Sequence, residues 1–590
     1  MYDIDMSQIF IKLPFLIELF FNGLFILVYS LKLTDRLPRT WSIDYVNQFL
    51  EVGTIIIPFV LFFSVVINFL ASKGIDDYLR RYVFSLVVFI PMVITWGDTE
   101  FAFWLSSAHL LSTILSLYDA SEEEVPEVEM DLSGMPRNAF SMSNLLRQIS
   151  LKPAQVILFS FAGVILLGTF LLMLPIASAT GESFSFVDSL FMASSAVCVT
   201  GLSTISIGTQ YSLFGQGVTL LLIQIGGLSI MTFYASMTII LGRSMGMKSK
   251  IMMLDIFDAG SLEDVFNMIF DIIKYTLVIE LWGGLLLTVG FVMEGFEFGQ
   301  ALYYGIFHSV SAFCNAGFSL FDTSLESFGT KPLIHGTIMV LVVLGGLGFT
   351  VLKELRLTII GRRAIVRLTA HTKIVIVTSA ILIFSAAVFI FFGEFLNALD
   401  GYTLWEKMQI SLFQSVTLRT AGFNSIPLGN LHSYTLYMMC LYMFIGGSPG
   451  STAGGIKTTT LAILIQSIVA TIKNERSVHL FDRQISPAVV VRTIAITFIS
   501  LILVSVFILV MMRLESKQSF LSVMFEVVSA SGTVGLSLGI TTLLSSVGKL
   551  TITLVMFIGR IGPLTLLLAI GQRENKAGKF DYPEGRIMIG

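Results

Sequence analysis

The feature that most constrains this chain is a short pattern ending in glycine and an apolar residue, which occurs four times. The four copies are Val199-Thr200-Gly201-Leu202, Asn315-Ala316-Gly317-Phe318, Thr420-Ala421-Gly422-Phe423 and Thr533-Val534-Gly535-Leu536. Their glycines are 116, 105 and 113 residues apart, so a unit of that length is repeated. A second glycine follows each copy after 24 to 28 residues, at Gly226-Gly227, Gly345-Gly346, Gly446-Gly447 and Gly559-Arg560. The repeat therefore includes a loop and the helix after it.

Each loop lies between two apolar segments that are long enough to cross a bilayer, which takes about 20 residues. The pairs are residues 155–175 with 213–241, 274–293 with 333–352, 374–393 with 433–471, and 493–512 with 550–571. Hydrophobic residues make up 55% of the chain and charged residues only 13%. Irregular backbone at membrane depth is tolerated only where it is buried in protein or lines a watery cavity. We therefore expect an all-α integral membrane protein with eight crossings and four re-entrant loops around one pore.

The loops have the chemistry of a cation filter. A bare alkali cation loses its hydration shell only if a ring of oxygens replaces it, and backbone carbonyls are the usual source. Glycine accepts the backbone conformations that turn carbonyls inward. A short helix is expected before each loop, at residues 184–197, 301–313, 404–416 and 519–530. A single loop of this kind would be interpreted as a helix C-cap, but four in register between paired crossings favour a pore.

Charge predicts the orientation of the chain. Basic residues collect in the connectors between repeats, at Arg243, Lys248, Lys250, Arg362, Arg363, Arg367, Lys373, Lys473, Arg476, Arg483 and Arg492. Such connectors face the cytoplasm, which leaves the loops outside. Acidic residues gather on the loop side, at Glu182, Asp188, Glu294, Glu297, Asp322, Glu326, Glu394 and Asp400. They either form a rim that attracts cations or are ordinary solvated loop residues.

Further segments lie on both sides of the repeats. Four apolar stretches, residues 11–31, 54–72, 80–96 and 101–118, come first, and an acidic stretch follows them. The first ten residues have no basic run, so the first crossing is expected to be retained rather than cleaved. The expected organisation is a transmembrane extension of about four helices (1–118), a cytoplasmic acidic linker (119–153), pore repeats at 154–242, 243–361, 362–472 and 473–571, and a cytoplasmic tail (572–590).

Cysteine and histidine give no catalytic or metal site. Cys198 and Cys314 each lie three residues before a loop glycine, and Cys440 lies in an apolar segment. This spacing suits neither a disulfide framework nor a metal site, so we interpret the three as packing residues. The six histidines are scattered, whereas an enzyme needs converging groups. The chain is therefore not expected to be an enzyme.

The loops resemble those of the potassium-translocating subunits of the Trk, Ktr and HKT superfamily. The resemblance covers about residues 150 to 590 and rests on the hexapeptides CVTGLS, CNAGFS, RTAGFN and GTVGLS. It implies four units in one chain, each with an M1 helix, a pore helix and an M2 helix. The implied filter residues, with potassium as the transported ion, are Val199, Thr200, Gly201, Asn315, Ala316, Gly317, Thr420, Ala421, Gly422, Thr533, Val534 and Gly535. Relatives that pass sodium tend to have serine at the first glycine, so Gly201 favours potassium. Sodium, rubidium and ammonium permeation stay open, as does activation by sodium.

The third M2 segment is expected to contain a gate. Its sequence includes Gly446-Gly447-Ser448-Pro449-Gly450-Ser451-Thr452-Ala453-Gly454-Gly455, and glycine and proline at this density break a helix. Arg560 is the repeat equivalent of Gly447 and lies in an apolar run, where an unpaired charge is costly. We expect it to pair with loop carbonyls or a carboxylate and to oppose cation passage. The resemblance also implies an obstructing loop braced by this arginine, while a buried arginine without a gating role is the alternative.

Other polar residues in the apolar segments have weaker signals. Glu280 could pair with a basic residue, line a fenestration or be a structural carboxylate. Gln224 and His109 are expected to be satisfied by neighbouring helices, and Arg419 to anchor the third loop by hydrogen bonds. Lys457, after the gate loop, is expected to meet cytoplasmic water.

Residues 579–590 resemble the end of Ktr-type membrane subunits. In that subgroup the tail helps to pair two membrane subunits and touches a cytoplasmic ring that binds nucleotides. This chain has no nucleotide-binding motif, so any control by ATP, ADP or NAD is expected to come from a partner. The implied assembly is a homodimer in the cytoplasmic (inner) membrane, in contact with lipid and a regulatory ring. It would have no nucleic acid and no cofactor of its own.

Two alternatives stay open, one of the same architecture and one of another class. A sodium-permeable or sodium-coupled transporter of the same architecture would have the same repeats. A secondary transporter with a midplane site also has repeats and broken helices, but it predicts two halves where this chain has four loops. Stoichiometric coupling to sodium or protons would separate these cases.

Overall fold

The computed structural model describes residues 153–228, 262–359 and 368–562, together with isolated positions between residues 22 and 106. The chain divides into two compact units, residues 1–150 with 234–269, and residues 151–233 with 270–590. Several expectations fall outside the described residues: the N-terminal extension apart from those isolated positions, the acidic linker before residue 153, the tail, His109, and the connectors with Arg243, Lys248, Lys250, Arg362, Arg363 and Arg367. These stay predictions.

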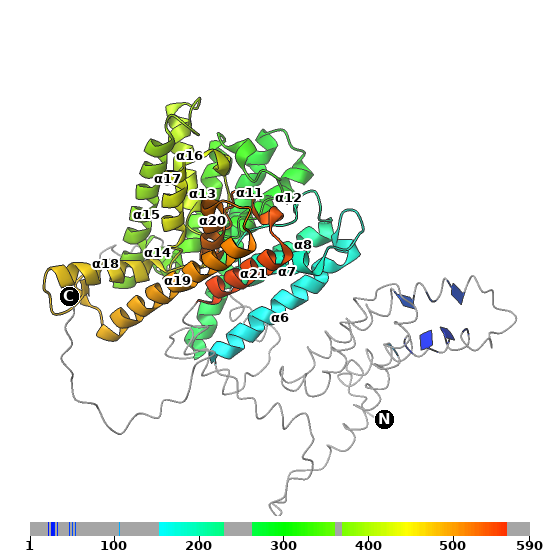
Figure 1. Cartoon of the computed structure of the whole chain (residues 1–590), viewed down its shortest axis with the longest axis horizontal. Coiled ribbons are helices and arrows are strands. Elements are labelled where there is room, and N and C mark those ends of the chain that lie inside the picture. Colours follow the sequence, from blue (N-terminus) through cyan, green and yellow to red (C-terminus); the bar gives the residue numbers. More distant parts are fainter. Residues whose placement is uncertain are drawn as a thin grey trace, which may run out of the picture. The chain divides into compact units, whose positions relative to one another are not determined.

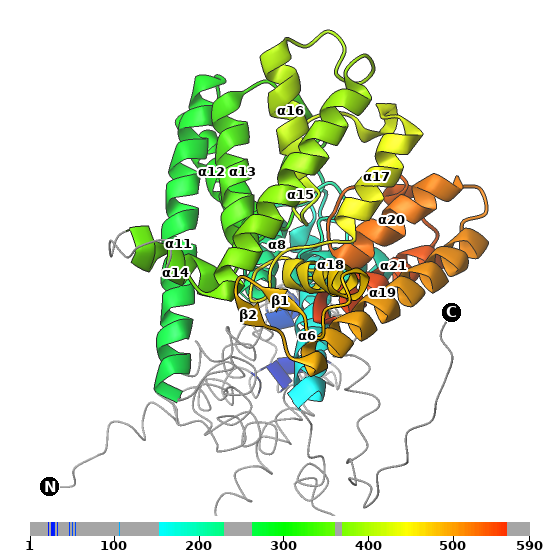
Figure 2. The same cartoon turned by 90° about the vertical axis from the view of Figure 1, so that its left-hand side faces the viewer.

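The described part of the second unit is almost entirely helical (Figures 1 and 2). In chain order its helices are α6 (Pro153–Met173), α7 (Phe186–Val197), α8 (Leu213–Gly227), α11 (Leu262–Met293, which begins in the first unit), α12 (Phe298–Phe313), α13 (Pro332–Leu347), α14 (Phe349–Ile359), α15 (Ala370–Glu394), α16 (Leu404–Thr417), α17 (Ser433–Met443), α18 (Thr458–Ile472), α19 (Pro487–Leu514), α20 (Phe520–Gly532) and α21 (Ser546–Ile561). The strands are β1 (His479–Leu480) and β2 (Arg483–Gln484), paired antiparallel between α18 and α19. Short 3-10 turns lie at Pro175–Ala177, Glu326–Phe328, Leu428–Asn430 and Thr541–Leu543.

The short helices expected before the loops are present as α7, α12, α16 and α20. Three of them begin at a hydroxyl residue whose side chain accepts a hydrogen bond from the first turn: Ser185, Thr403 and Ser519. Such a cap satisfies a backbone N–H that has no partner inside the helix. The side chain of Glu406 also accepts a hydrogen bond from the backbone N–H of Thr403. The two bonds together form a capping box.

Contacts between the helices close a ring. The short helix packs on the first helix of its own repeat: α6 with α7, α15 with α16 and α19 with α20. In repeat 2, a β-carbon on Gly305 of α12 would lie 2.7 Å from the Gly284 carbonyl oxygen of α11. The helix after each loop packs on the short helix of the next repeat: α8 on α12, α13 on α16, α17 on α20, and α21 on α7. The last of these contacts joins the fourth repeat to the first. The four loops therefore meet at a common centre.

Two of the helices after the loops are broken. The segment 333–352, expected as one crossing, is not a single straight helix, because α13 ends at Leu347 and the chain turns by 106° into α14. Gly348 at the bend has φ of 94°, and a β-carbon there would lie 2.7 Å from the carbonyl oxygen of Pro449. The chain therefore bends where it meets the glycine-rich loop of repeat 3. That loop separates α17 from α18, as its glycines and proline predict.

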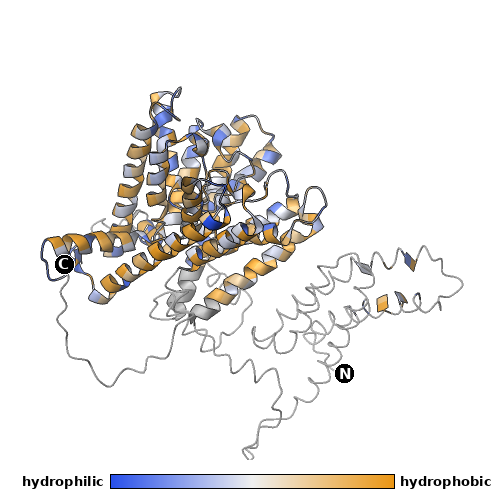
Figure 3. Ribbon diagram, in the orientation of Figure 1, coloured by the Kyte–Doolittle hydropathy of each residue, from blue (hydrophilic) through white to orange (hydrophobic). Residues whose placement is uncertain are grey.

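Hydrophobic residues predominate along the outer helices (Figure 3). Trp282 on α11, Phe384 on α15 and Leu509 on α19 are 64%, 66% and 71% exposed, as expected of residues that face lipid. Among the described residues, three helices are long and apolar enough to cross a membrane, or four if the bent pair α13 and α14 counts as one. The expected eight crossings are thus found only in part. The helices after the loops are shorter, since they end near the second glycine of each repeat.

Candidate functional site

The four loops share one backbone conformation. The residue two positions before each glycine has a positive φ, with values of 55° at Val199, 58° at Asn315, 66° at Thr420 and 51° at Thr533. The glycines themselves have φ of 94°, 71°, 78° and 93° in chain order. Positive φ is uncommon for residues other than glycine and carries a cost that surrounding structure must offset. Its recurrence in every copy shows that the sequence repeat is also a structural repeat.

The loop glycines pack against one another in a closed order. A β-carbon added to Gly201 would lie 2.4 Å from the carbonyl oxygen of Ala316, and one on Gly317 would lie 2.6 Å from that of Ala421. On Gly422 it would lie 2.7 Å from the carbonyl oxygen of Val534, and on Gly535 2.1 Å from that of Thr200. Each glycine thus touches the next repeat, and the fourth touches the first. The structure brings all four expected filter loops together as a ring of backbone.

Serine side chains that the sequence reasoning missed hold three of the loops. Ser195 Oγ accepts from the Gly201 N–H at 3.1 Å, and Ser529 Oγ accepts from the Gly535 N–H at 3.1 Å. In repeat 2, Ser311 Oγ instead donates to the Phe318 carbonyl at 2.8 Å. These serines all lie six residues before the loop glycine. That shared register was the signal that could have found them.

The second glycine of each repeat has a packing role. A β-carbon would lie 2.1 Å from the Val197 carbonyl oxygen at Gly226, 1.9 Å from that of Phe313 at Gly345, and 2.2 Å from that of Ser531 at Gly559. Each of these carbonyls lies four residues before a loop glycine. The backbone of the helix after the loop therefore touches the backbone at the end of the short helix. Only glycine permits so close an approach, because any side chain would clash with the carbonyl oxygen. In repeat 3, Gly446 packs against the glycine-rich loop that follows it. A β-carbon on Gly446 would lie 2.0 Å from the Gly454 carbonyl oxygen.

The glycine-rich loop of repeat 3 contacts two other repeats. On one side, Ser448 N–H donates to the Gly346 carbonyl at 3.0 Å and Thr452 N–H to the Gly345 carbonyl at 3.3 Å. On the other side, a β-carbon on Gly454 would lie 2.1 Å from Thr533 Oγ1 in the fourth loop. Ser448 and Thr452 are buried. The loop therefore extends from the end of α13 to the fourth repeat, next to the ring.

Arg560 bonds to carbonyls, one of the two pairings expected for it. Its guanidinium donates to the Thr452 carbonyl in the glycine-rich loop and to the Gly226 carbonyl at the end of α8. Among the described residues no carboxylate is paired with it. Arg560 belongs to repeat 4. Its two hydrogen bonds connect the glycine-rich loop of repeat 3 to α8 of repeat 1.

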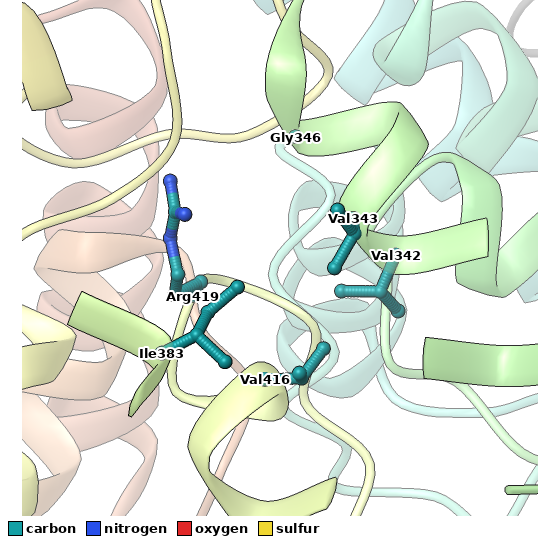
Figure 4. Close-up of a pocket in the computed structure, with 6 residues that line it drawn as sticks. All are labelled: Val342, Val343, Gly346, Ile383, Val416 and Arg419. Carbon is teal, nitrogen blue, oxygen red and sulfur yellow. The ribbon is translucent and has the colours of Figure 1, made fainter. Parts of the chain in front are cut away.

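Arg419 does not anchor the third loop as expected. Its side chain is only 9% exposed, yet no described residue forms a hydrogen bond or ion pair with its guanidinium, and Nε has no partner. It lies across a small pocket from Val342, Val343 and Gly346, with Ile383 and Val416 completing the lining (Figure 4). A backbone bond from Ala421 N–H to the Thr417 carbonyl at 3.0 Å holds the loop instead.

The other polar residues have local partners. Glu280 accepts from Gln224 Nε2 at 3.4 Å and from Cys314 Sγ at 3.8 Å, which fits the structural alternative and not a basic partner. Cys198, Cys314 and Cys440 are free and buried, in agreement with a packing role. Lys457 Nζ donates to the Ala453 carbonyl at 2.7 Å, so it binds the loop that precedes it.

Of the eight acidic residues on the loop side, Glu182, Glu297, Asp322 and Asp400 are exposed, whereas three others are paired or buried. Glu394 is fully buried and accepts from the His432 N–H. Glu294 pairs with Lys331 at 2.7 Å, and Asp188 pairs with Lys549 at 2.6 Å. Glu394, Glu294 and Asp188 thus connect helices. For the four exposed acids, both alternatives stay open.

The Asp188–Lys549 pair gives a stability prediction. It joins α7 to α21, and its side chains are only 26% and 16% exposed. Asp188→Asn should lower the free energy of unfolding by about 1.5 to 3 kcal/mol, since a hydrogen bond between charged groups is lost. Thermal unfolding of the purified protein would measure this. Glu294→Gln is the matched control, because its partner Lys331 is 43% exposed and the loss should be below about 1 kcal/mol. Equal melting temperatures for both variants would contradict the prediction.

Comparison with known proteins identifies relatives over most of the chain. The family model described as "TrkH: Cation transport protein" matches residues 139–575. The Ktr system potassium uptake protein B of Bacillus subtilis is 35% identical over 448 residues, which cover 76% of this chain and 98% of that protein. The potassium/sodium uptake protein NtpJ of Enterococcus hirae is 36% identical over 446 residues, covering 75% and 98%.

A solved structure shares the fold. The crystal structure of the potassium transporter TrkH from Vibrio parahaemolyticus matches with a TM-score of 0.58, covering 88% of this chain and 97% of that one. The two sequences are 16% identical. This likeness supports an all-helical membrane fold, in agreement with the all-α class expected from the sequence.

Proposed function

Because this chain belongs to the TrkH family of cation transport proteins, we propose that it carries potassium ions inward across the cytoplasmic membrane. The observation that carries the proposal is the ring of loops, in which each glycine lies against a carbonyl of the next repeat. A closed ring of backbone carbonyls can replace the hydration shell of a potassium ion. The filter residues are those of the four loops: Val199, Thr200 and Gly201 with their equivalents in repeats 2 to 4.

Unpaired oxygens in the ring support a cation as the occupant. Thr200 Oγ1 and Thr533 Oγ1 are buried and have no hydrogen-bond partner among the described residues. A buried hydroxyl without a partner is costly, whereas a cation is a natural partner for its lone pairs. These two threonines belong to repeats 1 and 4, which are neighbours in the ring.

The glycine-rich loop is proposed as the gate. It contacts the end of α13 on one side and Thr533 on the other, so it lies beside the ring of loops that an ion would cross. Arg560 holds its middle at Thr452 and places a positive charge there. In this proposal the gate consists of Gly446, Gly447, Ser448, Pro449, Gly450, Ser451, Thr452, Gly454, Gly455 and Arg560. Flux would require Arg560 to release the loop.

Sodium transport is the second candidate. The relative NtpJ is named as a potassium/sodium uptake protein, so a related chain can be associated with both ions. The glycine at position 201 favours potassium in this chain. Activation by sodium, a homodimer and a nucleotide-binding ring as regulatory partner also belong to the proposal. The family consists of cation transport proteins, and no enzymatic activity is proposed.

Uptake by cells without their own potassium systems tests the proposed function. The unmodified chain, with a candidate ring partner where one is needed, should restore growth at low potassium and take up rubidium. Gly201→Ser should lower rubidium uptake and raise sodium uptake, since serine adds a side chain where the next carbonyl is within 2.4 Å of a β-carbon. Failure of the unmodified chain to support any uptake would contradict potassium transport.

A further inference from the structure

The residue nine positions before each loop glycine is buried in all four repeats, but its chemistry alternates. Repeats 1 and 3 have Met192 and Phe413 there, whereas repeats 2 and 4 have His308 and Glu526. Repeats 2 and 4 are not neighbours in the ring, because the nearest contacts of each loop glycine are to the repeat before or after its own. Two polar, ionisable side chains therefore lie behind opposite loops, and neither belongs to the filter residues.

Glu526 ties the chain after the fourth loop glycine to the helix before it. One carboxylate oxygen accepts from Ser537 Oγ at 2.7 Å and the other accepts from Thr541 Oγ1. Ser537 Oγ also accepts from the Gly539 N–H at 3.0 Å. The carboxylate is fully buried, so these bonds form away from water, where they contribute more than at a surface. We call Glu526, Ser537 and Thr541 the acidic brace.

His308 makes the same connection in repeat 2. Its Nδ1 lies 2.8 Å from the Tyr304 carbonyl, which can only accept, so Nδ1 carries the hydrogen. Its Nε2 lies 3.0 Å from Ser319 Oγ. Ser319 and Ser537 are both two residues after a loop glycine. The brace is thus built twice, with different chemistry, on opposite sides of the ring.

The other two repeats lack it. Ser203 has the same register in repeat 1, but the residue behind it is Met192, which offers no polar atom to a hydroxyl other than a weakly accepting sulfur. In repeat 3 the residue two positions after the glycine is Asn424, whose side chain donates to Glu326 and to the Ile426 carbonyl. A side-chain hydrogen bond between these two positions is thus found in repeats 2 and 4 and not in repeats 1 and 3.

Glu526 also has no basic partner among the described residues. A fully buried carboxyl group that is neither paired nor part of a filter is costly to keep. Each of its two oxygens accepts a hydrogen bond from a hydroxyl group, Ser537 Oγ or Thr541 Oγ1. This geometry fixes the path of the chain after Gly535. Selectivity by carbonyl oxygens depends on holding them in place.

We propose that Glu526 is a positioning residue of the ion pathway, which holds the fourth loop through Ser537 and Thr541, with His308 as its counterpart in repeat 2. The proposal rests on the proposed function, since a filter must exist for the brace to position it. Loosening one brace should let the fourth loop adapt to a second cation. The effect should therefore appear in selectivity and not only in the amount of folded protein.

The test compares the ion selectivity of variants in which the serine two residues after a loop glycine is replaced. Ser537→Ala removes a donor from the brace, whereas Ser203→Ala removes the matching hydroxyl where no brace exists. Rubidium and sodium uptake are measured in the same cells, and their ratio is independent of expression level. Ser537→Ala and Glu526→Gln should lower the ratio about tenfold, the equivalent of one lost hydrogen bond to a charged group. Ser203→Ala should change it less than about twofold.

A second measurement separates local loosening from misfolding. Hydrogen exchange of purified protein should be faster in residues 536–545 of Ser537→Ala than of the unmodified chain, with no change at residues 202–211. Uptake by the unmodified chain with equal ratios in all variants would overturn the brace and leave potassium transport standing. No uptake by the unmodified chain would overturn both. A lower ratio in Ser203→Ala equal to that in Ser537→Ala would also overturn the brace.

Discussion

Replacing Gly535 with alanine should lower potassium uptake by about 100-fold or more. A β-carbon at this position would lie 2.1 Å from the Thr200 carbonyl oxygen, and φ of the residue is 93°. Both the first and the fourth loop would have to move, because the contact is between backbone atoms that cannot swing aside. Rubidium uptake, normalised to the amount of protein in the membrane, would measure the loss.

The control for this prediction separates backbone strain from the contact between loops. Gly295 has φ of 96° and no atom within 4 Å of an added β-carbon. Gly295→Ala therefore introduces the same strain without a clash, and uptake should stay within about threefold of the unmodified chain. Near-normal uptake by Gly535→Ala would show that the ring of glycines does not shape the pathway.

Replacing Arg560 with glutamine should raise uptake, by about tenfold at low potassium. The guanidinium donates to the Thr452 carbonyl in the glycine-rich loop and to the Gly226 carbonyl at the end of α8, so these two bonds tie the loop to repeat 1. Their loss frees the loop and removes a positive charge from its surroundings. Initial rates of rubidium uptake would reveal the increase.

Two further variants make the gate prediction decisive. Arg513→Gln removes an exposed arginine at the end of α19, so it controls for the loss of charge alone and should leave uptake unchanged. Shortening residues 447–453 removes the loop itself and should raise flux even if Arg560→Gln fails to fold. If uptake rises in neither the loop deletion nor Arg560→Gln, the gate proposal is wrong and Arg560 is a structural arginine.

Local sequence patterns predicted much of the fold. The four short helices lie where a helical-length segment precedes a loop glycine, because caps and helix propensity act over a few residues. The interruption between α17 and α18 follows from its glycines and Pro449 in the same way. The pairing of Arg560 with carbonyls was one of two alternatives that followed from the cost of an unpaired charge in an apolar segment.

The tertiary structure decided what depends on residues far apart in the chain. The bend at Gly348 arises where Pro449 of another repeat approaches. The side chain of Arg419 finds no partner among the described residues and Asp188 pairs with Lys549, although the local sequence around each indicated neither outcome. The order of the ring, with Gly535 against Thr200, likewise requires the fourth repeat to meet the first. Periodicity and composition indicate whether a segment faces lipid, water or protein. Which residue becomes its neighbour depends on how helices from different repeats pack, and no single stretch of sequence determines that packing.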